Sequence, residues 1–304
     1  MNILITGGTG FVGSHLCPAL ARQGHHLTVL TRQPDRARER LPEGSRCVRR
    51  LEDIESEAVF DAVINLAGEG IAEARWSARR KQALLDSRVG VTRALGALLE
   101  RLNQRPQVLI SGSAIGFYGD AGNVELTEGS PAVRRDFTYL LCDAWEQAAR
   151  EVAQAAALRL CILRIGVVIG PGGMLERLRP VYRLGLGAQL GDGQQWMSWI
   201  HVDDLVALIL RCLETPAASG VYNAVAPQPL PHGRFHRLLA ERCRRPGFMR
   251  VPGWPLKLML GEMSVLLLGG QRVLPRRLLD QGFQFRYPEM GAALDAVLDV
   301  PDAR

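Results

Sequence analysis

The sequence predicts an α/β protein: a Rossmann-type, doubly wound parallel sheet with a smaller C-terminal α/β cap. The first observation is the start of the chain, where strand, glycine turn, helix and strand follow one another within about thirty residues. The second is the alternation of apolar runs with helical patterns, which continues to about residue 225. The third is a change after residue 173, where glycine-rich and polar segments interrupt that alternation.

The first strand is predicted at Asn2–Thr6, a short apolar run that fits one buried strand and is too short for a helix. Gly7 can adopt backbone angles closed to other residues, and Gly10 lets the main chain approach a pyrophosphate. Gly13 allows the following helix to pack closely, and the start of that helix presents N–H groups and partial positive charge to phosphates. The residues here that we expect to contact a dinucleotide are Gly7, Thr9, Gly10, Phe11, Val12 and Gly13.

The second strand ends at Leu30, and Thr31 and Arg32 follow it. Sites that prefer NAD usually place Asp or Glu here, to hold the ribose hydroxyls. A hydroxyl and a guanidinium suit a 2′-phosphate instead, because Arg can grip it with two hydrogen bonds. The sequence therefore favours NADP(H) over NAD, the alternative being a solvated loop arginine.

The remaining elements continue the same alternation. The segment 62–68 is the clearest later strand, and it ends in small residues at the edge of the sheet where a cofactor lies. Residues 76–102 form one long helical pattern, with an interruption expected near Val89 and Gly90. Asp203 or Asp204 is expected to cap a helix that ends near Leu213. Further strands are predicted at 45–51, 107–111, 158–165 and 221–224, and helices at 137–157 and 235–243.

Composition narrows the class of protein. The 304 residues are 47% hydrophobic, enough for a sizeable core, and the formal net charge is +6. Lys81 and Lys257 are the chain's two lysines, so nearly all its basic residues are arginines. These arginines are spread along helices, and Arg36, Arg38 and Arg40 are expected to form a solvated face, so we expect no nucleic-acid partner.

No signal segment and no apolar run long enough to span a bilayer is recognisable. Six scattered cysteines fit reduced thiols, and no group of residues has metal-ligand spacing. We therefore expect a cytoplasmic protein with no metal site and no membrane partner.

Several short motifs occur in a fixed order along the chain: the glycine turn, Asn65-Leu-Ala-Gly68, a Ser111-to-Gly119 loop, Leu163-to-Pro171, Ile200-to-Leu205 and Gly220-to-Asn223. Together they resemble the extended short-chain dehydrogenase/reductase superfamily, in its NAD(P)-dependent epimerase/dehydratase group. The segments 267–275 and 282–288 are similar to the C-terminal domain of one atypical branch, whose members have been labelled epimerase-family or cell-division-inhibitor-like.

The resemblance implies an NADP(H)-binding domain at 1–170, with returning segments from about 200–225, and a substrate-side cap at 171–304. The branch-specific C-terminal domain would cover about 248–296. A homodimer is also implied. Cofactor contacts are implied at Thr31, Arg32, Leu66, Ala67, Gly68, Arg88 and Val167.

One departure limits what the resemblance says about catalysis. Typical superfamily members use a tyrosine as acid and base and a lysine four residues later that lowers the pKa of the phenol. No Tyr-x-x-x-Lys pair occurs in this chain, and Thr138 and Cys142 stand at the corresponding positions. Tyr139 is one residue away, which turns its side chain by about 100° around the helix.

The candidate catalytic residues are therefore Ser113, which could polarise a carbonyl, and Tyr139. Tyr118 is a candidate lining residue of the substrate pocket; the alternative for both Ser113 and Tyr118 is a role in the structure of their loop. His201 and Asp203 are interpreted as structural. Trp196 and Trp199 either wall the substrate cleft or pack in the core.

Two hypotheses follow for function. The first is an NADP(H)-dependent oxidoreductase or epimerase-like enzyme acting on an unidentified small polar substrate. The second is an NADPH-binding regulatory protein, catalytically weak or inactive, that acts on a protein partner and is linked to cell division.

Overall fold

A computed structural model of the chain describes residues 1–298. Its centre is a seven-stranded sheet in the order β12-β7-β5-β4-β1-β2-β3, with every neighbouring pair parallel. The strands are β1 (Asn2–Thr6), β2 (His26–Leu30), β3 (Arg46–Val48), β4 (Ala62–Asn65), β5 (Val108–Ala114), β7 (Arg159–Ile165) and β12 (Gly220–Ala224). The order reverses between β1 and β4, which places a ligand crevice beyond their carboxyl ends.

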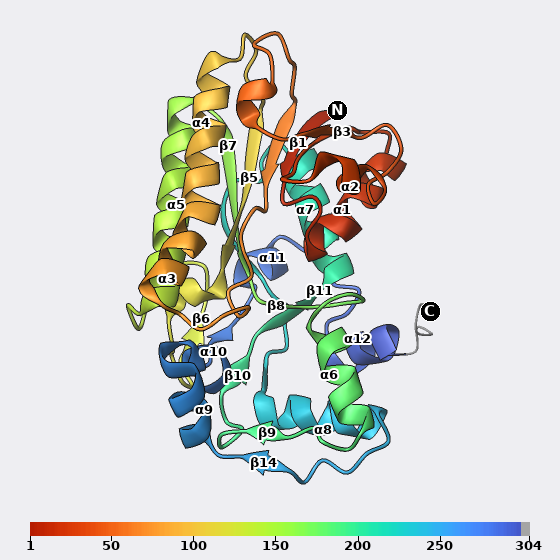
Figure 1. Cartoon of the computed structure of the whole chain (residues 1–304), viewed down its shortest axis with the longest axis vertical. Coiled ribbons are helices and arrows are strands. Elements are labelled where there is room, and N and C mark those ends of the chain that lie inside the picture. The colour runs from red at the N-terminus through yellow and green to blue at the C-terminus, as the bar shows by residue number, and fades with distance from the viewer. Residues whose placement is uncertain (299–304) are drawn as a thin grey trace.

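Helices cover both faces of this sheet (Figure 1). On one face, Ile3 and Ile5 pack with Leu16 of α1 (Phe11–Arg22) and Leu205 of α7 (Val202–Glu214). On the other face, Leu4 belongs to a core that also contains residues of α4 (Val91–Arg101) and α5 (Phe137–Ala155). Alternate residues of one strand thus point to opposite faces, as a strand buried on both sides requires.

The helical pattern at 76–102 is divided where the sequence predicts an interruption. Helix α3 (Ala78–Leu85) is capped by Ser77, whose hydroxyl accepts a hydrogen bond from the backbone N–H of Arg80. A π-helical turn (Asp86–Gly90) then joins α3 to α4. Such turns insert one residue into a helix and rotate the side chains that follow them.

The predicted cap of α7 is wrong. His201 precedes the helix, and its Nδ1 accepts a hydrogen bond of 3.2 Å from the backbone N–H of Asp203. Asp203 and Asp204 lie in the first helical turn. The carboxylate of Asp204 accepts instead from the backbone N–H groups of Arg286, at 2.7 Å, and Tyr287, at 3.0 Å, and so fastens the C-terminal segment to α7.

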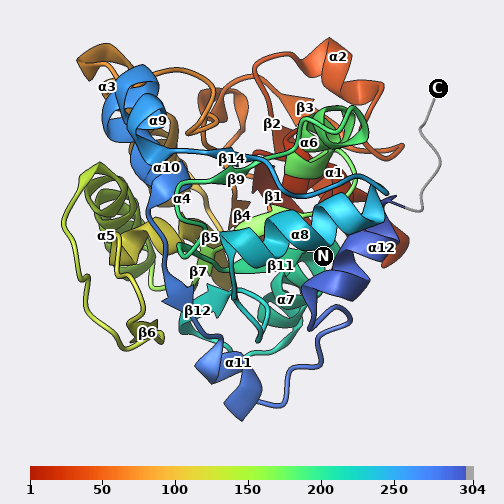
Figure 2. The ribbon, with the colours of Figure 1, turned by 90° about the horizontal axis from the view of Figure 1, so that it is seen from below.

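The smaller C-terminal part surrounds a second core that includes Trp199, Phe235 and Leu294 (Figures 1 and 2). Short strands pair as β8–β11, β9–β14, β10–β13 and β6–β15. They are β6 (Glu125–Leu126), β8 (Val167–Ile169), β9 (Gln189–Leu190), β10 (Trp196–Met197), β11 (Trp199–His201), β13 (Leu230–Pro231), β14 (Arg250–Val251) and β15 (Arg272–Val273).

The short and C-terminal helices complete this part and the flank of the sheet. They are α2 (Pro34–Arg38), α6 (Met174–Arg183), α8 (His232–Arg242), α9 (Gly253–Leu260), α10 (Val265–Leu268), α11 (Arg276–Asp280) and α12 (Met290–Leu298). The last six residues of the predicted cap lie outside the described part of the chain. Within residues 1–298, no helix has the length and apolar character needed to cross a membrane.

Candidate cofactor and substrate site

The glycine turn after β1 is held by contacts that exclude a side chain. Gly7 has a φ of +74°, and a Cβ there would lie 2.5 Å from the carbonyl oxygen of Leu66. A Cβ at Gly13 would lie 2.4 Å from the carbonyl oxygen of Gly7, so α1 packs directly on the turn. Gly10 begins α1 and offers no side-chain cap, which leaves the first N–H groups of the helix available to an anion.

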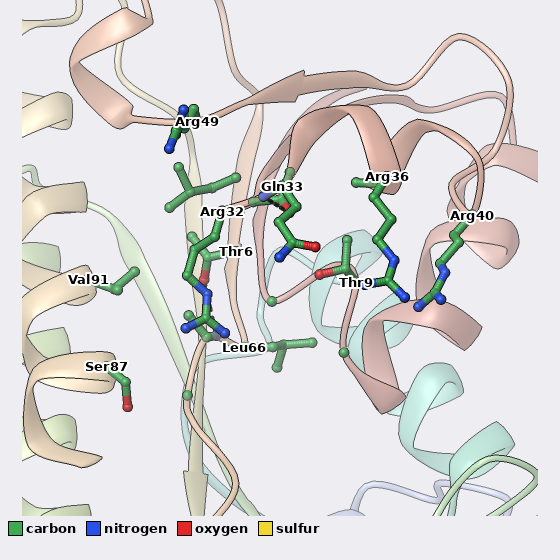
Figure 3. A pocket seen from close by; sticks show the side chains of 17 residues that line it. Thr6, Thr9, Arg32, Gln33, Arg36, Arg40, Arg49, Leu66, Ser87 and Val91 are labelled. Carbon is green, nitrogen blue, oxygen red and sulfur yellow. Dashed lines mark hydrogen bonds between the residues drawn. The ribbon is translucent and has the colours of Figure 1, made fainter. Parts of the chain in front are cut away.

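A cavity of about 830 Å³ opens beside this turn (Figure 3). Its walls come from the turn after β1, the ends of β2 and β4, helix α2, and the helix that follows the π-helical turn. The residues that line it are Thr6, Gly7, Thr9, Gly10, Leu30, Thr31, Arg32, Gln33, Arg36, Ala37, Arg40, Arg49, Leu66, Ala67, Gly68, Ser87 and Val91. Of the predicted cofactor residues, eight line this cavity: Gly7, Thr9, Gly10, Thr31, Arg32, Leu66, Ala67 and Gly68.

Other predicted cofactor residues are not among those that line the cavity. Phe11 packs against the loop 170–173, where a Cβ at Gly173 would lie 2.7 Å from its ring. Val12 packs against the core beneath the sheet, and Val167 lies on β8 opposite Trp199 of β11.

Four arginines face the cavity, and among the described residues that line it there is no carboxylate. Arg32 has a side chain 91% exposed, with its Nη1 3.7 Å from Oε1 of Glu69. Arg36 and Arg40 extend in the same direction from the α2 segment (Figure 3). Arg36, Arg38 and Arg40 are all exposed, as the predicted solvated face requires. Arg38 pairs with Asp35, whereas Arg36 and Arg40 also line the cavity.

Arg36, Arg40 and Arg49 were not identified as site residues from the sequence. The spacing of Arg36 and Arg40, four residues apart on a helical segment directly after β2, was the available signal. Arg49 follows β3 and carries no such signal; it reaches the cavity because β3 pairs with β2.

Arg88 does not line the cavity but holds the loop after β4, which does. It is half buried in the π-helical turn, where its Nη2 donates to the carbonyl oxygen of Glu69 at 3.0 Å and its guanidinium lies 5.3 Å from the ring of Trp145. Burial lowers the pKa of this guanidinium. A Cβ at Gly68 would lie 2.9 Å from Arg88 Cζ, so Arg88 fixes the loop after β4 rather than lining the cavity.

The chain is similar to known proteins over nearly its whole length. The model of the NAD dependent epimerase/dehydratase family matches residues 3–225, and a domain of unknown function (DUF1731) matches residues 251–297. The chain belongs to the NAD-dependent epimerase/dehydratase family. It is 36% identical to the epimerase family protein YfhF of Bacillus subtilis over 98% of both chains.

Two solved structures of this family are similar to the chain. Human epimerase family protein SDR39U1 (isoform 2), crystallised with NADPH, is 31% identical, with a TM-score of 0.87 over 99% of this chain and 100% of that one. A nucleoside-diphosphate sugar epimerase from Corynebacterium glutamicum is 32% identical, with a TM-score of 0.77 over 98% of this chain and 58% of that one.

Thr138 and Cys142, the positions that the sequence resemblance matches to the acid/base pair, lie near the start of α5. Thr138 is buried, and its hydroxyl contacts the carbonyl oxygen of Gly116 at 3.2 Å. Cys142 is also buried, and burial, reinforced by the nearby Glu146, raises the pKa of its thiol to about 12. Tyr139 is half buried and turned aside, with its ring 5.6 Å from that of Phe117.

Ser113 belongs to a buried polar network. It is 2% exposed and donates a hydrogen bond of 2.8 Å to Oε1 of Glu146. Arg164 donates to both oxygens of the same carboxylate, at 2.8 and 3.0 Å, and its Nη1 donates to the hydroxyl of Tyr118 at 3.0 Å. That hydroxyl donates in turn to Oδ1 of Asn223 at 2.7 Å.

The prediction that Tyr118 lines the substrate pocket is wrong. Its side chain is fully buried, and burial raises the pKa of the phenol. The network joins β5, α5, β7 and β12, so it stabilises the sheet and the helix that packs on it. The sequence signal for it was Arg164, a charged residue inside an apolar strand.

His201 and the two tryptophans have structural contacts. His201 is buried beneath α7, and burial lowers the pKa of its imidazole to about 4. Trp199 is fully buried and donates from Nε1 to the carbonyl oxygen of Gln228 at 3.0 Å. Trp196 is half buried, with the guanidinium of Arg272 4.9 Å from its ring.

A second cavity, of about 870 Å³, lies between the sheet domain and the C-terminal part. Apolar walls come from Trp76, Phe137 and Leu268, among others. Both lysines of the chain, Lys81 and Lys257, also line it. Lys81 pairs with Glu262, and its ammonium lies 5.1 Å from the ring of Phe137.

Proposed function

We propose that this chain binds NADP(H) and acts as an oxidoreductase or epimerase-like enzyme on a small polar substrate. The observation that carries the proposal is the first cavity, which is lined by four arginines and, among the described residues, by no carboxylate. Such a cavity favours a dinucleotide with an additional phosphate, because each guanidinium forms charge-assisted hydrogen bonds to phosphate oxygens. NADPH in the crystal of the human relative supports the same choice.

The residues present fit this cofactor. Gly7 and Gly13 keep the turn free of side chains, and the start of α1, which has no side-chain cap, would present its first N–H groups to the pyrophosphate. Thr31, Arg32 and Arg36 would hold the 2′-phosphate, and Leu66 and Ala67 would flank the adenosine. When bound, the nicotinamide ring supplies or accepts a hydride, which is the chemistry of the family.

The second cavity supports a substrate held between the sheet domain and the C-terminal part. Its lining combines aromatic and aliphatic walls with the cations Lys81, Arg134, Arg135 and Lys257. Three carboxylates also line it: Asp136 caps α5, Asp120 accepts a hydrogen bond from the backbone N–H of Gly270, and Glu262 pairs with Lys81. A substrate with an anionic group and an apolar body therefore suits this cavity best.

Proton transfer in such an enzyme cannot follow the usual Tyr-Lys route. The thiol of Cys142 stays protonated near neutral pH, because its pKa is raised to about 12. Ser113 can polarise a substrate oxygen only by giving up its bond to Glu146. Transfer would then fall to Ser113, to another group in the pocket, or to water.

The same observations favour a second candidate function. A protein that keeps the cofactor cavity while Ser113 and Cys142 are engaged in buried contacts could use NADPH as a signal and act on a protein partner. Its cofactor would stay bound and unreacted.

The experiment that separates the two starts from purified protein loaded with NADPH. Fractions of a cell metabolite extract are added while the absorbance of the reduced nicotinamide is followed. Loss of absorbance with one fraction, absent in Arg32→Ser, establishes turnover and delivers the substrate. Lys81→Met and Lys257→Met should bind NADPH normally but need higher substrate concentrations.

If NADPH stays bound and unreacted with every fraction, the enzyme proposal loses its support. A pull-down with and without NADPH then tests the second candidate. A partner recovered in one state of the cofactor alone supports it, and identical recoveries contradict it.

A further inference from the structure

The lower end of the molecule carries an unusual distribution of charge. Residues 242–261 contain five Arg or Lys and no Asp or Glu, and residues 177–191 contain three Arg and no Asp or Glu. The whole chain has a net charge of +6, so the rest of it is slightly acidic. The positive charge is therefore concentrated in these two stretches.

The two stretches lie side by side. Strand β14 of the first pairs with β9 of the second, Arg250 opposite Gln189. The Nε of Arg245 donates to the carbonyl oxygen of Arg183 at 2.7 Å. In Figure 1, β14 and α9 form the lower end of the molecule, and Figure 2 views that end directly.

The same end exposes large apolar side chains. Phe248 is 76% exposed, Trp254 70%, Leu258 73% and Leu184 74%. Leu186, Met249 and Met259 are exposed as well. Trp254 and Leu258 are four residues apart on α9, so they project from one face of that helix.

We propose that this basic and apolar end, residues 177–191 with 242–261, docks on the surface of an anionic lipid bilayer. Basic side chains near such a surface are attracted to anionic headgroups, while Trp, Phe and Leu side chains enter the boundary with the acyl chains. A nucleic acid would use the charges and the aromatic rings but would gain nothing from Leu184, Leu258 and Met259. The sequence expectation of no membrane partner rested on the lack of a spanning segment, and a surface contact needs none.

The docking surface is separate from the cofactor cavity, which lies beyond the carboxyl ends of the sheet strands. The proposal thus holds whether the chain is an enzyme or a regulatory protein. Docking would keep the sheet domain and its cofactor cavity on the side turned away from the lipid.

Co-sedimentation of the full chain with lipid vesicles tests the proposal. Vesicles of phosphatidylcholine alone are compared with vesicles containing about one-third phosphatidylglycerol. The protein should pellet with the second kind, and added salt should release it. Trp254→Ser/Leu258→Ser should weaken binding at least about tenfold, and Arg250→Gln about fivefold.

Matched controls lie on the sheet domain. Leu140→Ser removes a leucine of α5 that is 55% exposed, against 73% for Leu258, and Arg93→Gln removes an exposed arginine from α4; neither should change pelleting. NADPH binding checks that every variant is folded. Equal pelleting with both kinds of vesicle, no pelleting, or wild-type pelleting of the α9 variants would overturn the proposal, as would binding to an oligonucleotide in place of vesicles.

Discussion

Ser113 and Glu146, 33 residues apart in the sequence, are joined by a buried hydrogen bond of 2.8 Å. The carboxylate of Glu146 has no exposed surface, and Arg164 binds both of its oxygens. The hydroxyl of Ser113, which the sequence makes a candidate catalytic group, thus donates a hydrogen bond to the buried ion pair of Glu146 and Arg164.

Replacing the two partners should have unequal effects. Ser113→Ala should lower the free energy of unfolding by about 1 kcal/mol, because Glu146 keeps its bonds to Arg164. Glu146→Gln should cost about 3–5 kcal/mol, since it leaves the guanidinium of Arg164 buried without its carboxylate. Urea unfolding measures both. Equal losses would show that Ser113 carries as much of the network as the ion pair.

The arginine cavity predicts cofactor preference. Arg32→Ser and Arg36→Ser should each weaken NADPH binding about tenfold or more and change NADH binding little, because a charge-assisted hydrogen bond to the 2′-phosphate is lost. Isothermal titration with both cofactors measures this. Arg38→Ser is the control, since Arg38 pairs with Asp35 outside the cavity. Equal weakening of NADPH and NADH would contradict the assignment.

The two glycines with similar backbone angles provide another test. Gly7 and Gly24 have φ of +74° and +79°, so alanine at either adds strain of about 1 kcal/mol. A Cβ at Gly24 meets no atom within 4 Å, whereas one at Gly7 meets the Leu66 carbonyl at 2.5 Å. Gly7→Ala should therefore abolish NADPH binding, and Gly24→Ala should preserve it. If both variants lose NADPH binding, the cause is the backbone strain that they share and not the contact of the added Cβ with Leu66.

Buried histidines make the fold sensitive to acid. Burial lowers the pKa of His201 and His232 from 6.5 to about 4. Between these values the unfolded chain binds more protons, so the free energy of unfolding should fall as pH falls from 6.5 toward 4, by up to about 3 kcal/mol for each histidine.

His201→Asn tests this contribution, because Asn can still cap α7 while it cannot titrate. Chemical unfolding at pH 7 and pH 5 should show a smaller difference for the variant than for the wild type. An unchanged difference would assign the acid sensitivity to other groups.

The sheet and the glycine turn could be predicted because their signals are local. Five consecutive residues define β1, and the spacing of Gly7, Gly10 and Gly13 defines the turn and the start of α1. The ends of elements are harder to predict from the sequence. Strand β5 was expected to end at Ser111, but it continues to Ala114 because its last residues still pair with β7.

The rest of the site depends on contacts between distant segments. Arg49 reaches the cavity through strand pairing, and Tyr118 is buried because Arg164 and Asn223 meet its hydroxyl. The cap of α7 was misassigned because acidic residues are common caps, while a histidine that accepts from a backbone N–H is not. No spacing along the chain encodes these partners.

Strand β12 is added to the edge of the sheet only after the chain has left the sheet at the end of β7 and formed several other elements. It pairs with β7, Val221 opposite Ile162, and the intervening residues build α6, the four short strands β8, β9, β10 and β11, and α7. During synthesis from the N-terminus, β7 is therefore an unprotected edge until residue 224 has left the ribosome. A fragment ending near residue 170 would retain the glycine turn yet present that edge to other chains, so a cofactor-binding fragment should extend through β12.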